Sequence, residues 1–170
     1  MGTRTRIDLM EQPRIENLNT RLLVGKNLTT NMLNNRTFEL WSSFMPNKKQ
    51  IANTIGSDLY SIQCYNQAIN YQEYNPAEDY TLWAAIEVSS YGTLPKHYSK
   101  FTLDGGLYAV FIHRGLAADF KKTMNAIFEY WLPTSNYKID HRPHFEILGD
   151  KYKNNHPSSE EEVWIPIRPK

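Results

Sequence analysis

The chain has 170 residues and a net charge of +1 at pH 7, so its charge gives no reason to expect a nucleic acid or an acidic membrane as partner. The only cysteine, Cys64, excludes an internal disulfide and a thiolate metal cluster, and no apolar run approaches the ~20 residues of a membrane-spanning helix. The basic start MGTRTRIDL lacks the apolar segment of a signal peptide. We therefore expect a cytoplasmic protein with a disordered leader, residues 1–12, and a single domain, residues 13–170.

The first half of the chain predicts one helix between strands. Residues 20–28 form an apolar-rich strand. Residues 30–45 should form a helix that Thr29 or Thr30 caps and that ends before Pro46. Its buried face is predicted from spacings of three and four: Leu33, Thr37, Leu40, Trp41 and Phe44. Residues 58–65 and 81–88 are the next strands, separated by a polar loop, and residues 89–100 are a linker.

The second half repeats this order. Residues 106–113 predict a strand, and residues 118–131 predict a helix that ends at Pro133. Short strands follow at residues 144–148 and 162–167. Two units, residues 18–90 and 101–168, thus share the order strand, helix, strand, strand. Side by side they predict an α+β fold, with one antiparallel sheet, two main helices on one face and a central cleft between the halves.

Several motifs of the second half resemble a known family. They are Gly106, Tyr108–Phe111, His113 and Gly115, then Trp131-Leu132-Pro133, Ser135, Tyr137 and Asp140, then Arg142-Pro143, Phe145-Glu146 and Trp164–Ile167. The sequence resembles the GyrI-like small-molecule-binding domain, which is also the effector-binding domain of bacterial transcription activators. The resemblance covers most of the second half and is looser over the first. It implies a duplicated fold with an aromatic cleft and a buried glutamate, at Glu146. No helix-turn-helix motif is evident, so the chain looks like a stand-alone member.

Glu146 is the candidate functional residue. In the strand HFEIL, Phe145 and Ile147 point to one face and Glu146 to the other. On an exposed face it would pair with Arg142 or a lysine. In a cleft it would attract a lipophilic cation or, with a raised pKa, act as a general base. Glu87, on a face with Trp83 and Ala85, is a second acid that would make Glu146 harder to ionise if both lined the groove.

Aromatic residues are the other candidates for ligand contacts. Core packing is the ordinary role of any one tryptophan, but Trp41 and Trp131 end helices that would border the groove. The full set of candidate ligand-binding residues is Trp41, Tyr65, Trp83, Glu87, Tyr91, Tyr108, Trp131 and Glu146.

Other reactive side chains indicate little chemistry. His141 and His144 have the H-x-x-H spacing of a metal site but no evident third ligand, so we expect no metal. The family resemblance suggests a structural hydrogen bond for His113, and Cys64 is expected to be a buried inert thiol. The sequence contains no cofactor-binding glycine motif, and we expect no cofactor.

Three functions remain open. The first is a binding module for hydrophobic or cationic small molecules. The second is a hydrolase of electrophilic small molecules, with Glu146 as base. The third is an inhibitor protein that contacts DNA gyrase or a toxin. We favour ligand binding with possible hydrolysis, because one carboxylate in an aromatic groove serves either chemistry and no second catalytic group decides between them.

Overall fold

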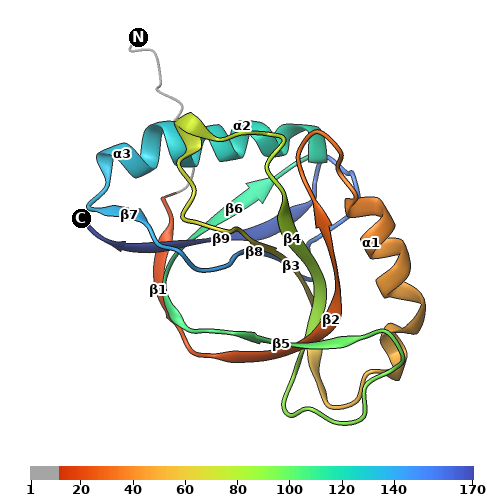
Figure 1. Ribbon diagram of the computed structural model, residues 1–170. Coiled ribbons are helices and arrows are strands. Elements are labelled where there is room, and N and C mark those ends of the chain that lie inside the picture. Colours follow the sequence, from red (N-terminus) through yellow and green to blue (C-terminus); the bar gives the residue numbers. More distant parts are fainter. Residues whose placement is uncertain (1–11) are drawn as a thin grey trace.

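The computed structural model describes residues 12–170, and nearly all of the expected leader lies outside this range. A curled antiparallel sheet of nine strands carries helices on one face (Figure 1). The first unit comprises β2 (Arg21–Thr30), α1 (Thr37–Phe44), β3 (Thr54–Cys64) and β4 (Tyr80–Val88). A 3₁₀ turn at Met45–Gln50 extends α1, and a second lies at Tyr71–Glu73. The α+β duplication expected from the sequence is therefore confirmed.

The second unit repeats the first with a longer helical segment. It comprises β6 (Gly106–Arg114), then α2 (Phe120–Asn125) and α3 (Leu132–Thr134), then β8 (His144–Leu148) and β9 (Glu160–Pro169). A 3₁₀ turn, Ala117–Asp119, precedes α2, and a π-helical stretch, Ala126–Trp131, joins α2 to α3. Three short strands complete the sheet: β1 (Arg14–Leu18), β5 (Ser99–Leu103) and β7 (Tyr137–Ile139).

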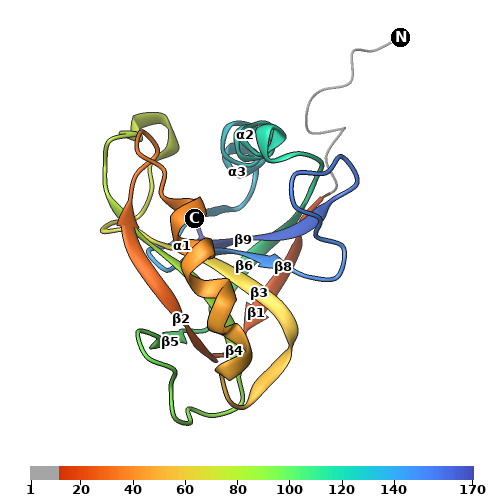
Figure 2. The ribbon, with the colours of Figure 1, turned by 90° about the vertical axis from the view of Figure 1, so that its right-hand side faces the viewer.

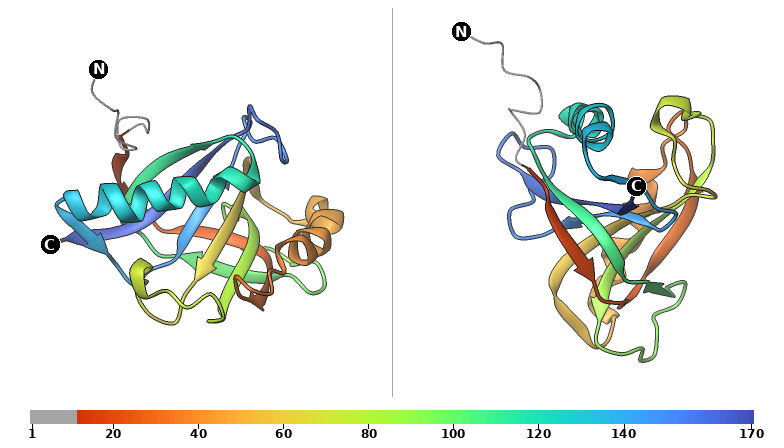
Figure 3. Two further views of the ribbon diagram at one scale, coloured as in Figure 1. Left: turned by 90° about the horizontal axis from the view of Figure 1, so that it is seen from above. Right: turned by 90° about the vertical axis from the view of Figure 1, so that its left-hand side faces the viewer.

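The strand order explains why the sheet curls. It runs β1-β6-β9-β8-β3-β4-β2-β5, with β7 on β9, so the two units meet where β8 pairs with β3. Although β1 directly precedes β2, the two lie toward opposite ends of this order, and the same is true of β5 and β6. Each short connection therefore draws the two ends together, as the right-hand view of Figure 3 shows. A Cβ added at Gly105 would lie 2.2 Å from the Leu18 carbonyl oxygen, which shows how closely the connections approach.

Both faces of the sheet are covered. On the outer face, Leu40 and Phe44 of α1 pack on β2 and β4, while Ile127, Phe128 and Trp131 pack on β6 and β9. The inner face, enclosed by the curl, holds a third cluster, whose largest fully buried members include Tyr108 and Phe145. Figure 2 shows α1 and α2 apart over the same face, with β3 and β8 between them. The central strands are thus the part of the outer face between the two helix-covered clusters.

Several local expectations were wrong. The first helix begins at Thr37, not at residue 30, and Leu33 is 74% exposed outside it. Thr30 does not cap it: its Oγ1 accepts a hydrogen bond from the Arg36 amide, which closes the loop before the helix. The second helix continues one residue beyond Pro133. The expected linker 89–100 overlaps the start of β5, and β1, β5 and β7 were not anticipated.

Candidate functional site

The candidate site lies on the outer face, where β8 and β3 join the two units. Glu146 is opposite Ser61 in the register of these strands, and both are partly exposed. Phe145 and Ile147, on either side of Glu146, are buried in the inner cluster. The alternation expected for HFEIL is therefore confirmed, and it directs the Glu146 carboxyl to the face that carries the helices.

Glu146 has a neutral partner and no cation. Its Oε2 accepts a hydrogen bond of 2.9 Å from Nε2 of Gln63. Within residues 12–170 it forms no ion pair. Burial of the carboxyl and the nearby charge of Glu161 raise its pKa from 4.5 to about 8, although the hydrogen bond from Gln63 acts in the opposite direction. At pH 7 the carboxyl of Glu146 is therefore protonated and uncharged in most protein molecules. A bound cation would favour its ionised form.

Arg142 is not the partner of Glu146. Its Nε donates to Asp140 Oδ2 at 2.9 Å, and Nη2 donates to the carbonyl oxygens of Leu107 and Ile167. Its guanidinium also lies 4.6 Å from the centre of the Tyr108 ring. These contacts hold Arg142 in a structural role, and they exclude the exposed ion pair weighed as an alternative for Glu146.

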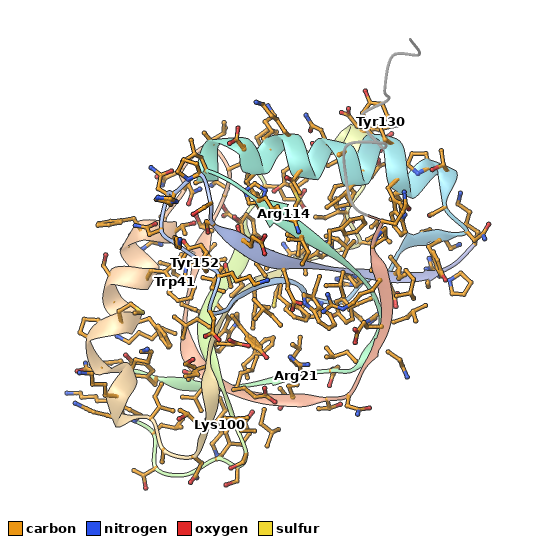
Figure 4. All side chains as sticks on the ribbon, turned by 180° about the vertical axis from the view of Figure 1, so that it is seen from behind. Arg21, Trp41, Lys100, Arg114, Tyr130 and Tyr152 are labelled. Atoms are coloured by element: carbon orange, nitrogen blue, oxygen red, sulfur yellow. The ribbon has the colours of Figure 1, made fainter. Side chains whose placement is uncertain are left out.

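Tyr65 follows Gln63, the hydrogen-bond partner of Glu146, by two residues on β3 and the loop after it. Burial raises the pKa of Tyr65 and of Tyr80, and the charge of Glu146 adds to both rises. The Tyr65 ring contacts Tyr80 and His144 at centroid distances of 5.1 Å. Trp41 is half-buried on α1 with its ring edge-on to Phe44. Figure 4 shows Trp41 on α1, on the same side of the molecule as Tyr152 from the loop between β8 and β9.

The remaining predicted residues lie elsewhere. Trp83 and Tyr108 belong to the inner face, where Trp83 packs on Phe101 and Tyr108 is fully buried. Trp131 is buried against Phe111 under the second helical segment. Tyr91 follows β4 and donates a hydrogen bond to the carbonyl oxygen of Phe101. Of the eight residues predicted, Trp83 and Tyr108 pack on the inner face, whereas Trp41, Tyr65, Tyr91 and Trp131 pack on the two clusters of the outer face.

Glu87 is not the counterpart of Glu146. It lies on β4, which corresponds to β9 in the second unit, whereas Glu146 lies on β8, which corresponds to β3. Glu87 also faces inward: the Tyr60 hydroxyl donates to it at 3.3 Å and accepts from Arg21, which lies within the curl in Figure 4. The two acids face opposite sides of the sheet, so the condition under which each would make the other harder to ionise is not met. Glu161, which no sequence pattern singles out, is the acid whose charge raises the pKa of Glu146.

The other candidates have structural surroundings. His113 bonds through Nδ1 to Thr123 Oγ1 and through Nε2 to the Leu116 carbonyl oxygen, as its resemblance to the family suggested. His141 reaches the Tyr65 carbonyl oxygen, while burial lowers the pKa of His144 to about 3. Among the described residues no group of three potential ligands could hold a metal ion. Burial raises the pKa of Cys64 to about 11, so its thiol stays protonated.

Two cavities of about 430 and 410 Å³ lie away from Glu146. One lies beside α1 and includes Lys26, Arg36 and Glu39; the other lies near α3 and includes Phe128, Tyr137 and Lys138. Glu146 lines neither. No helix in the described part of the chain is long and apolar enough to cross a membrane.

The doubled strand–helix–strand–strand unit of this chain is the fold that its resemblance to the GyrI-like effector-binding domains implied. The comparison with family models agrees. Residues 14–167 match the family described as "Cass2: Integron-associated effector binding protein", and the chain belongs to this family. It is an effector-binding domain, a class that binds small molecules, and residues 12–170 hold no separate DNA-binding domain.

The individual relatives share low sequence identity with this chain. The chain is 24% identical over 130 residues to the transcriptional regulator BrlR of Pseudomonas aeruginosa; the alignment covers 76% of this chain and 45% of that protein. The integron cassette protein VCH_CASS2 of Vibrio cholerae is 16% identical, with a TM-score of 0.63 over 94% of this chain and 97% of that one. SAV2435 bound to tetraphenylphosphonium is 15% identical, with a TM-score of 0.66 over 93% and 94%. These structural likenesses establish the shared fold.

Proposed function

We propose that this protein binds lipophilic organic cations on the outer face between α1 and α2, with Glu146 as the counter-ion. The observation that carries the proposal is the carboxyl of Glu146, which no cationic side chain neutralises within residues 12–170. A buried negative charge without a cation is costly, so a positive ligand that also covers the carboxyl from water recovers part of that free energy.

The surroundings of Glu146 suit such a ligand. Tyr65 and Tyr80 are aromatic groups near the carboxyl, and ring faces attract cations. The partner Gln63 is neutral and therefore leaves the negative charge of Glu146 available. SAV2435, which shares the fold, was solved with tetraphenylphosphonium, a lipophilic cation, and this supports the same class of ligand here.

Calorimetric titration with tetraphenylphosphonium tests the proposal. Glu146→Gln keeps the size and hydrogen-bonding capacity of the side chain but removes its charge, so we expect about 10- to 100-fold weaker binding. Glu160→Gln is the matched control, because Glu160 pairs at the surface with Arg114 at 2.8 Å. The control should bind within about twofold of the wild type. Equal affinity for the wild type and Glu146→Gln would refute the role of Glu146.

Hydrolysis of electrophilic small molecules is a second proposal that uses the same residue. A carboxyl with a pKa of about 8 is a stronger base than an ordinary glutamate, which suits it to activating water. Incubation with epoxide-containing or similarly strained compounds, followed by mass spectrometry, separates the two. Consumption by the wild type and not by Glu146→Gln would support an enzyme, whereas intact ligand after long incubation would support binding alone. Contact with DNA gyrase or a toxin stays a prediction, which a pull-down would test.

A further inference from the structure

Three consecutive glutamates open β9, and within residues 12–170 two of them have cationic partners while the third has none. Glu160 pairs with Arg114 and Lys151, and Glu162 pairs with Arg14 at 2.7 Å. Across residues 12–170, the Glu161 carboxyl accepts no hydrogen bond and forms no ion pair. Surface glutamates are generally solvated or paired. Glu161 is instead partly buried, and no described side chain pairs with it.

The strand register brings Glu161 to the same face as Glu146. Glu146 is opposite Val163 in the pairing of β8 with β9, so Glu161, two residues before Val163, points to the same side. Side chains in this diagonal relation lie roughly 7–8 Å apart at their backbones, within reach of each other when they are long. The charge of Glu161 indeed raises the pKa of Glu146. The two carboxyls are therefore neighbours on the candidate site.

The nearest histidine does not neutralise Glu161. His113 is its direct partner in the register of β6 with β9, but both ring nitrogens of His113 are already bonded within the second unit. Burial raises the pKa of Tyr152, an aromatic side chain of the loop between β8 and β9, and the charge of Glu161 adds to this rise. Glu161 thus has a neutral aromatic neighbour and an acidic one.

These contacts extend the proposed function, on which the inference rests. We infer that Glu161 is a second recognition carboxyl of the site, and that the site prefers ligands with two positive groups to monocations built on the same ring system. A monocation placed against Glu146 leaves the repulsion between the two carboxyls only partly compensated. A second positive group a few ångströms away would meet Glu161 and could stack on Tyr152.

Ethidium and propidium provide a matched pair of probes. They share one cationic phenanthridinium ring system, and propidium adds a quaternary ammonium on a short arm. We would measure the fluorescence change of each dye on titration with protein at 150 mM salt, where charges far from the site are largely screened. The wild type should bind propidium about tenfold more tightly than ethidium.

Variants assign this preference to Glu161. Glu161→Gln should bring the ratio of the two dissociation constants close to one and change ethidium binding much less. Glu160→Gln should leave the ratio as in the wild type, and Glu161→Asp, which keeps the charge, should retain most of it. Equal binding of the two dyes by the wild type, or an unchanged ratio in Glu161→Gln, would overturn the inference. The proposed function would survive either result if ethidium binding still depended on Glu146. Ethidium binding that is absent, or indifferent to Glu146→Gln, would overturn both.

Discussion

The stability of this fold should depend on the charge of Glu146 in a direction opposite to that of an ordinary paired carboxyl. Its pKa is raised from 4.5 to about 8 in the folded protein. Between these two values the folded state binds more protons than the unfolded state, so the free energy of unfolding falls as pH rises. Below about pH 4.5 the carboxyl is neutral in both states and contributes no pH dependence.

The magnitude follows from the pKa difference. A rise from 4.5 to about 8 corresponds to a ceiling of roughly 5 kcal/mol above pH 8. Glu146 is partly exposed, and it titrates together with Glu161, so we expect about 2 kcal/mol. Glu146→Gln removes this cost. Above pH 8 it should therefore be more stable than the wild type, with a melting temperature about 5 °C higher. At pH 5 the two proteins should melt together.

Thermal unfolding followed by circular dichroism at pH 5, 7 and 9 measures this difference. Glu160→Gln serves again as control, because the pKa of Glu160 is lowered by its hydrogen bond from Arg114, and its removal should bring no gain at high pH. A Glu146→Gln protein that is equally or less stable than the wild type at pH 9 would show that the carboxyl is solvated or paired, and the argument for a cation site would fail with it.

Three further predictions concern the pH dependence of ligand affinity, the stability of two glycine variants and the reactivity of the Cys64 thiol. Tetraphenylphosphonium affinity should rise between pH 6 and pH 9 as Glu146 ionises, and calorimetry that finds no pH dependence would contradict the raised pKa. Gly106→Ala should cost about 2–4 kcal/mol in urea unfolding, because φ is 143° and a Cβ would lie 2.5 Å from Arg142 Nη1; Gly56→Ala, with φ 63° and no atom within 4 Å, should cost about 1 kcal/mol. Cys64 should react with iodoacetamide at pH 8 at least about a hundredfold more slowly than a free thiol, and comparable rates would show that it is accessible and ionised.

Strands with short apolar runs were predictable. The strand at residues 144–148 has the expected bounds, and those at 81–88 and 106–113 differ by one residue, because most of their side chains are apolar and buried. The missed strands β1 and β5 each bury only their last residue, Leu18 and Leu103, so their sequences carry almost no alternation. Tertiary pairing rather than local pattern forms them.

The start of the first helix was misplaced because an exposed leucine fitted the helical spacing. Leu33 lies one turn before the true helix, in a loop where the amides of Met32 and Leu33 donate to the Pro76 carbonyl oxygen. These two hydrogen bonds join segments that are far apart in the sequence, and no local sequence pattern predicts them. An apolar residue at the correct spacing predicts a helical face only when the backbone there is free to be helical.

Several residues predicted for the site lie apart from Glu146 for one physical reason, which is that both faces of this sheet are buried. Alternation separates two faces but does not identify the one that receives ligand. Tyr108 and Trp83 therefore satisfied the aromatic criterion while packing inside the curl. Glu87 satisfied the acidic criterion as well, but a chain of hydrogen bonds through Tyr60 links it to Arg21.

What distinguishes the proposed binding face is therefore an acid that has no cationic partner among residues 12–170. On the inner face, the acid is connected to a cation. On the outer face, Glu146 and Glu161 adjoin each other, and Gln63 is their only polar partner among the described residues. Sequence shows which residues carry charge but not which charges meet, because the partners come from strands brought together only by the curl. An acid that the rest of the fold leaves uncompensated is a stronger mark of a cation site than any number of aromatic residues.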